Sequence, residues 1–421
     1  MKKIIVVIFL LAGGCMLRAQ SITEIKVYVY SNKFEKGKTE LDKFLSNPAN
    51  ANNAEAWFYK AIVYNALSLD SARSFTDRYA LNQGSFEAIK KYSQLDPKET
   101  LTKEEKNETI FNVYYVYYDF GVKAFNVKDY NGAYDNFKNA LDVHDYIFTN
   151  NLEGPKGGKF ATLDTALVWN LAILSNELKK NNEVFGYYKK IVDNNLHDPQ
   201  YLEAYEGLLL NYKKEKDQAS FNIYLEKGKA NYPKEQFWQD IEIEDATNSD
   251  VINDALFKKY DEMAAKYPNS YLVFYNYAVM LTKFVNADEN KNTDLKPYKN
   301  KLPEELKKAI SINSTVEANM LLANYYYNNY FDITDDASKI KGTKADDVKK
   351  KTELTNAAKK SLDDCIPYAE AAADLYGKMP KLKASEKNYY RQTCDMLIEI
   401  YRVKGNAAKS AEYKVKKDAI L

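Results

Sequence analysis

Residues 117–140 read YYDFGVKAFNVKDYNGAYDNFKNA, and this stretch decides the fold of the chain. Apolar and small residues recur in it at the three-to-four-residue spacing of a helix: Tyr117, Phe120, Gly121 and Ala124, then Ala133, Phe137 and Ala140. Small residues such as Gly121 and Ala133 let two antiparallel helices approach, while Phe137 fills the space beside them. The stretch therefore predicts two packed helices joined at Lys128-Asp129-Tyr130.

These positions match the W-x2-L-G-x2-Y and A-x3-F spacings, so the stretch resembles a unit of the tetratricopeptide-repeat (TPR) family. The resemblance covers roughly Ala54 to the C-terminus and is closest to the secreted Gram-negative bacterial type with long insertions. It implies an all-α fold, a TPR-like superhelical solenoid of antiparallel helix pairs, with an inner groove lined by the first helix of each unit. It implies binding of other proteins or peptide segments, but it names no partner.

Weaker copies of this unit occur along the whole chain and give about seven to eight helix pairs. The position of Gly121 is taken in turn by Ala61, Ala172, Leu209, Ala278 and Leu322, and the last copy turns at Gly405-Asn406. Most steps between these positions exceed the family period of about 34 residues. The excess falls in polar stretches at 70–83, 150–159, 286–301 and 332–351, which we expect to be surface loops.

Three local patterns need separate interpretation. Val113 to Tyr118 is rich in β-branched and aromatic residues, but the helical spacing continues beyond it, so we expect a helix. Ile22 to Tyr30 alternates like a strand, and we interpret it as a divergent capping helix. Pro367 lies inside a pattern that predicts one long helix from about Ala345 to Tyr376, in which a proline causes a kink.

Residues 1–19 are typical of an export signal, and residues 20–421 then form the α-solenoid domain. Lys2 and Lys3 precede an apolar run too short to span a bilayer, and Ala19 precedes a cut that leaves Gln20 as the new terminus. This predicts a periplasmic or otherwise exported protein. The alternative is an outer-membrane lipoprotein acylated at Cys15, although Ala12 stands where such signals usually have leucine.

Composition excludes several classes of protein. Cleavage after residue 19 removes three positive charges and no acidic ones, so the formal net charge changes from +1 to −2. Without a basic excess, a nucleic-acid partner is not expected. No later stretch approaches the roughly 20 apolar residues of a membrane span. Only Cys365 and Cys394 remain, and we expect both to be free rather than bridged.

No catalytic residue, metal site or cofactor is predicted. The two histidines, His144 and His197, each lack a second ligand at helical or finger spacing, and we expect both in exposed turns. The segment Gly154–Lys159 superficially resembles a phosphate-binding loop. It has three residues between its glycines where four are needed, and Phe160 replaces the hydroxyl that binds magnesium, so we expect an ordinary flexible loop.

The groove positions of the family select eight residues: Tyr115, Tyr118, Trp169, Asn170, Ile173, Tyr275, Asn276 and Asn319. The amides can bind a peptide backbone and the aromatic rings its apolar side chains, unless the rings only pack neighbouring helices. We therefore predict a protein–protein interaction scaffold or adaptor of the bacterial cell envelope. One alternative is a binding component of an envelope uptake or glycan-handling system. The other is an enzyme on an unusual helical scaffold, which would require a closed pocket of perturbed acids.

Overall fold

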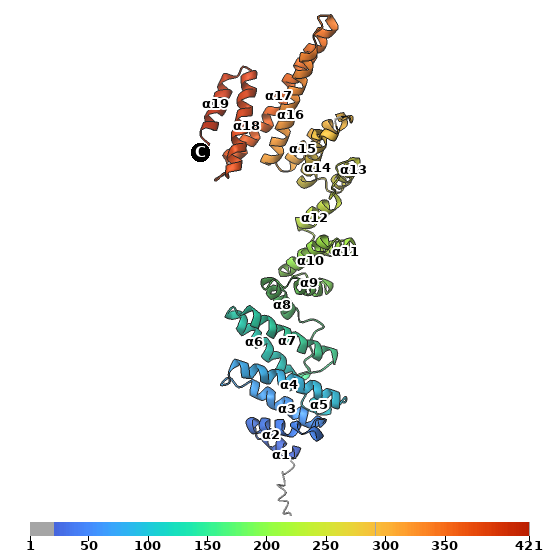
Figure 1. Ribbon diagram of the computed structural model, residues 1–421, viewed down its shortest axis with the longest axis vertical. Coiled ribbons are helices and arrows are strands. Elements are labelled where there is room, and N and C mark those ends of the chain that lie inside the picture. The colour runs from blue at the N-terminus through green and yellow to red at the C-terminus, as the bar shows by residue number, and fades with distance from the viewer. Residues whose placement is uncertain (1–20, 291, 421) are drawn as a thin grey trace, which may run out of the picture. The chain divides into compact units, whose positions relative to one another are not determined.

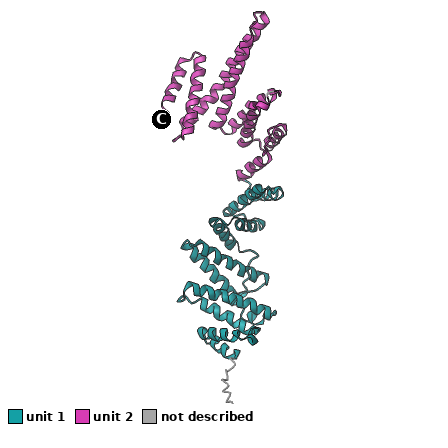
Figure 2. Ribbon diagram, in the orientation of Figure 1, with its two compact units in different colours: residues 1–233 teal, residues 234–421 magenta. Residues whose placement is uncertain are grey.

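The computed structural model describes residues 21–290 and 292–420. The predicted signal peptide and Cys15 lie outside these residues. Within them all regular structure is helical, and successive helices pack as antiparallel pairs (Figure 1). The all-α, TPR-like fold class is confirmed, and so are the helix at 113–118 and the capping helix at 22–30. The chain divides into two compact units, Met1–Pro233 and Lys234–Leu421 (Figure 2).

The N-terminal unit holds eleven α-helices in its described residues. They are α1 Ile22–Tyr30, α2 Phe34–Ser46, α3 Ala54–Ser68, α4 Phe75–Leu95, α5 Thr100–Glu104, α6 Glu108–Asn126, α7 Tyr130–Thr149, α8 Thr165–Glu177, α9 Asn181–Asp193, α10 Leu202–Glu215 and α11 Gln218–Asn231. The pair α6–α7 is the predicted hairpin. Its turn is made by Lys128, which adopts a positive φ of 63°, and by Asp129, whose carboxylate accepts from the Gly132 amide at 2.9 Å.

The C-terminal unit holds eight α-helices in its described residues. They are α12 Gln236–Ala246, α13 Asp254–Lys266, α14 Tyr271–Asn286, α15 Lys296–Ile312, α16 Val316–Lys339, α17 Ala345–Gly377, α18 Ala384–Val403 and α19 Ala407–Asp418. The predicted long helix with Pro367 inside it is therefore α17. The pairs α14–α15, α16–α17 and α18–α19 follow one another, so α14, α16 and α18 run in the same direction.

Two of the expected loops are mostly helix. In the stretch 332–351, α16 continues to Lys339 and α17 begins at Ala345, and in the stretch 70–83, α4 begins at Phe75. At the end of α16, Lys339 pairs with Asp335 at 2.8 Å and with Asp336 at 2.9 Å, so the polar sequence there supports a solvated helix. Many of the residues in excess of the family period therefore lengthen helices and do not form loops. The stretch 150–159 is irregular as predicted, apart from one 3₁₀ turn at Pro155–Gly157.

The prediction for His144 is wrong, because this residue is buried in α7 and is not in an exposed turn. Its Nε2 lies 3.1 Å from the Ala161 carbonyl oxygen, and its ring stacks on Phe160 with centroids 5.2 Å apart. The connection between α7 and α8 folds back over the hairpin, and Leu152 is buried in the process. The spacing of residues within α7 could not predict that this connection buries His144. His197 is exposed in the turn after α9, as predicted.

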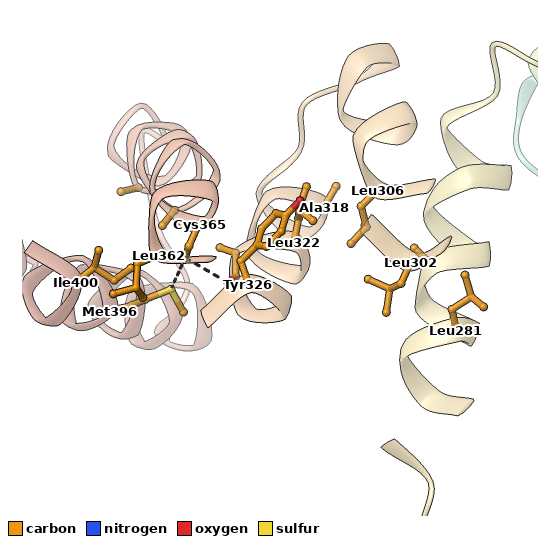
Figure 3. Close-up of a cluster of buried hydrophobic side chains, with 14 of the residues drawn as sticks. Leu281, Leu302, Leu306, Ala318, Leu322, Tyr326, Leu362, Cys365, Met396 and Ile400 are labelled. Atoms are coloured by element: carbon orange, nitrogen blue, oxygen red, sulfur yellow. Dashed lines mark hydrogen bonds between the residues drawn. The ribbon is translucent and has the colours of Figure 1, made fainter. Parts of the chain in front are cut away.

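The core of the C-terminal unit lies between its helix pairs (Figure 3). Buried leucines of α14, α15, α16 and α17 meet there, and small residues such as Ala318 and Ala369 allow the helices to approach. The Cys365 thiol lies in this layer, 3.3 Å from the Ala323 carbonyl oxygen and 3.9 Å from the Met396 sulfur. Cys365 and Cys394 are both free, which confirms the prediction.

Among the helices of the described residues, none combines the length and the apolar character that a membrane crossing requires.

Candidate functional site

A cleft of about 620 Å³ opens in the C-terminal unit between α14, α16 and α18. We call it the C-terminal cleft. Its lining comprises Tyr275, Val279, Thr282 and Lys283 of α14, Val316, Glu317, Met320, Leu321 and Asn324 of α16, Tyr376 of α17, Met379 of the following turn, and Glu386, Tyr389, Gln392 and Met396 of α18. Each first helix of three successive pairs therefore contributes one wall.

The helical period explains why these residues share one surface. On α14 the residues Phe274, Tyr277 and Leu281 face the core. Tyr275 and Val279 belong to a second stripe, spaced by four residues beside the first one. The lining residues of α16 and α18 recur at the same three-to-four-residue spacing. The cleft adjoins the core: Met396 is buried in the core, and Tyr275 and Met320 pack against it while they also line the cleft.

Contacts between the helices hold the cleft in shape. The Tyr271 and Thr315 hydroxyls are 2.8 Å apart and join the start of α14 to the start of α16. Tyr271 also stacks on Tyr275 with centroids 5.3 Å apart. The buried Thr393 hydroxyl donates to the Tyr389 carbonyl oxygen at 2.8 Å and lies 3.1 Å from the Met320 sulfur, which places α18 against α16. Several lining side chains are thus oriented before any partner arrives, which lowers the entropic cost of binding.

The two carboxylates of the cleft lie near its tyrosine hydroxyls. Burial raises the pKa of Tyr376, and the nearby Glu317 and Glu386 carboxylates raise it further. Burial also raises the pKa of Tyr275, again with a contribution from Glu317. Among the described residues, neither carboxylate forms an ion pair with a lysine or arginine. Negative charge therefore accumulates at the end where α14, α16 and α18 begin.

Three predicted groove residues belong to this unit, and their positions differ. Tyr275 lines the cleft, whereas Asn276 is half-buried on α14 and is not part of the lining. Asn319 is only 1% exposed, and its amide donates to the Ser314 hydroxyl at 2.8 Å and to the Thr315 carbonyl oxygen at 2.6 Å. Asn319 therefore organises the start of α16 and has no surface for a partner in this conformation.

The other five predicted residues lie on α6 and α8 of the N-terminal unit, so they do not join the C-terminal cleft. Tyr115 and Ile173 are exposed, and Tyr118, Trp169 and Asn170 are half-buried. Trp169 packs edge-on against Tyr201, with ring centroids 5.4 Å apart. This contact belongs to helix packing, as the alternative interpretation of the aromatic residues expects. A partner groove on these helices stays a prediction.

Several residues of the cleft were not predicted from the sequence. They are the methionines Met320, Met379 and Met396 and the tyrosines Tyr376 and Tyr389, none of which occupies a groove position that the family resemblance selects. Helical spacing on α18 is a signal that could have identified Tyr389 and Met396, whereas Tyr376 and Met379 come from α17 and the turn after it. Methionine and tyrosine together provide an adaptable apolar surface with polar rims, which suits peptide binding. In the described residues no group of three or more His, Cys, Asp or Glu could hold a metal ion.

No protein-family model matches the chain, and no curated protein matches its sequence. Solved structures of helical-repeat proteins are similar at low identity. A TPR repeats protein from Bacteroides fragilis has 17% identity over 67% of this chain and 98% of its own, with a TM-score of 0.27. Yeast Tom70 has 12% identity over 95% and 90%, with a TM-score of 0.27. Human IFIT1, in a dimer with m7Gppp-AAAA, has 14% identity over 89% and 73%, with a TM-score of 0.26.

Proposed function

We propose that the protein is an interaction scaffold of the bacterial cell envelope that holds a segment of another protein in the C-terminal cleft. One observation carries the proposal: three successive first helices contribute side chains to one cleft, and its apolar lining stays partly exposed beside the core. Exposed apolar surface that is concave and rimmed by polar groups is typical of a recognition site. The envelope location rests on residues 1–19, with their basic start and apolar run.

In-cell photo-crosslinking tests the binding site. A photoreactive phenylalanine analogue is placed at Tyr389, which lies in the cleft and is 54% exposed. The control position is Val415 on α19, which is 69% exposed and outside the cleft lining. We expect a discrete adduct from Tyr389 and none from Val415. Equal adducts from both positions, or none from Tyr389, would refute the cleft as the docking site.

Two matched variants measure what the cleft contributes. Tyr389→Ala removes an exposed ring from the cleft, and Phe331→Ala removes a ring of similar exposure, 49%, from α16 outside it. Captured partner should bind the Tyr389→Ala protein more weakly by about 2 kcal/mol, as expected for an aromatic anchor. The Phe331→Ala protein should bind like the wild type. Equal losses in both variants would indicate a general surface effect.

Mass spectrometry of the exported protein tests the location. We expect a new terminus at or near Gln20, recovered from the soluble envelope fraction. A diacylated terminus at Cys15 would instead place the same scaffold on a membrane leaflet. An uncleaved chain in the cytoplasm would overturn the envelope assignment and leave the cleft unaffected.

A further inference from the structure

The C-terminal cleft has opposite charges at its two ends. Because α14, α16 and α18 run in the same direction, their first residues meet at one end, where Glu317 and Glu386 lie. Lys283 lies near the far end of α14, eight residues after Tyr275 and thus about 12 Å along the helix. Among the described residues, no ion pair is found for Lys283, Glu317 or Glu386.

The acidic end is also aromatic. Tyr275, Tyr376 and Tyr389 line it together with the two carboxylates. Tyr376 is held in place by stacking on Tyr390, with ring centroids 5.4 Å apart. A cation near tyrosine rings is attracted by their electron-rich faces, and carboxylates in the same place add a direct charge. Rings and acids together suit a basic side chain better than either a carboxylate or a purely apolar group.

The hydrogen bonds of this end leave the acids available. One oxygen of Glu386 accepts from the Lys383 backbone amide at 2.6 Å, and this bond orients the carboxylate. Glu317 is the second residue of α16 and is exposed, and its carboxylate contributes to the raised pKa of both Tyr275 and Tyr376. Neither carboxylate has an ion-pair partner among the described residues, so a cation beside them would gain an attraction that the chain itself does not supply.

We propose that the partner of the C-terminal cleft is a peptide segment with a lysine or arginine that enters the acidic end beside Glu317 and Glu386. Apolar side chains of the same segment cover Met320, Val279 and Met396 further along the cleft. This inference rests on the proposed function, and it adds the chemistry and the direction of the bound segment. The acidic end selects against a partner whose C-terminal carboxylate would enter first, because like charges repel.

Selection from a phage-displayed random peptide library on the full chain tests the inference. We expect recovered peptides to combine apolar residues with a lysine or arginine. A Glu317→Gln/Glu386→Gln chain should recover apolar peptides without the basic residue. The control chain Glu304→Gln/Glu353→Gln removes two exposed glutamates of the same unit that do not line the cleft, and it should behave like the wild type.

A synthetic copy of a recovered peptide gives the size of the effect. Replacing its basic residue by glutamine should weaken binding roughly fivefold, the size expected for one partly exposed charge pair. The same replacement should have no effect on binding to Glu317→Gln/Glu386→Gln, and the difference should shrink in high salt.

The possible failures are distinguishable. Apolar peptides without a basic residue, lost on Tyr389→Ala, would overturn the inference and leave the proposed function standing. Peptides that bind equally well to the wild type and to Tyr389→Ala would contradict both. If the double variant does not fold by circular dichroism, the single variants Glu317→Gln and Glu386→Gln give the same comparison with half the charge removed.

Discussion

Gly121 on α6 lies directly against the ring of Phe137 on α7. A Cβ atom built on Gly121 would come within 2.5 Å of two ring carbons, closer than side-chain carbons approach each other. Both residues are buried, Gly121 on α6 and Phe137 on α7. The absence of a side chain at Gly121 is therefore what allows Phe137 to fill the space between the helices.

Gly121→Ala should destabilise the protein by about 1–3 kcal/mol, because the added methyl group forces the Phe137 ring or α7 to move. The matched control is Gly186→Ala on α9, where a Cβ would meet nothing within 4 Å. This second change should stabilise by roughly 0.5–1 kcal/mol through helix propensity. Urea denaturation followed by circular dichroism measures both. Equal effects of the two substitutions would contradict the packing argument.

Trp169→Ala should lower stability by about 2 kcal/mol and leave binding in the C-terminal cleft unchanged. The ring is half-buried and packs on Tyr201 and Tyr188, with centroids 5.4 Å and 6.4 Å away, so its loss creates a cavity at the α8–α9 pair. Denaturation measures the change in stability, and the crosslinking yield from the Tyr389 position measures partner binding in the C-terminal cleft. Unchanged stability with lost partner binding would instead support the predicted groove role of Trp169.

Cys365 and Cys394 should resist thiol reagents in the folded protein and react fully once it is unfolded. Burial raises the pKa of the Cys365 thiol to about 12 and that of Cys394 to about 11, and both side chains are inaccessible. Peptide mapping after iodoacetamide treatment, with and without urea, shows this. A reductant should not change the melting temperature. A decrease of several degrees would indicate a bridge, worth about 3 kcal/mol for this segment.

Glu105, at the end of α5, is a buried carboxyl with one unsatisfied oxygen. Its Oε2 has no hydrogen-bond partner among the described residues, while Oε1 accepts from the Thr109 amide at 3.0 Å and from the Thr109 hydroxyl. Burial raises the pKa of Glu105 to about 7 from an ordinary value of 4.5, more than the Thr109 hydrogen bonds lower it. The folded protein therefore keeps this proton at pH values where the unfolded chain has released it.

Stability should consequently fall as pH rises from about 4.5 to about 7, because the folded state binds more protons than the unfolded state in this range. Glu105→Gln mimics the protonated form and removes the dependence. The variant should gain up to about 3 kcal/mol over the wild type between pH 5 and pH 8. The control is Glu104→Gln, the exposed neighbour. A wild type and a Glu105→Gln variant with parallel pH profiles would contradict this account.

The candidate site was only partly accessible from the sequence. Tyr275, selected by the family spacing on α14, lines the cleft, and its contact with a partner stays a prediction. Asn319 follows the same spacing, yet its side-chain amide donates hydrogen bonds to Ser314 and Thr315 at the start of α16. Tyr376 comes from the far end of α17 and Met379 from the turn after it, and their approach to α16 depends on how the helix pairs stack. Spacing along one helix cannot predict a neighbour that another pair supplies.

The sequence by itself determined the helices and their pairing. Small residues at Gly121 and Ala133, and capping residues such as Asp129, act within one hairpin, so their effect can be read from local spacing. The tertiary structure alone decided which polar and aromatic side chains became buried and which met in the cleft. His144 is covered by a connection that folds back on it, and Glu317 and Glu386 share one end because three helices run in the same direction. Such long-range packing depends on the whole unit, and no short segment encodes it.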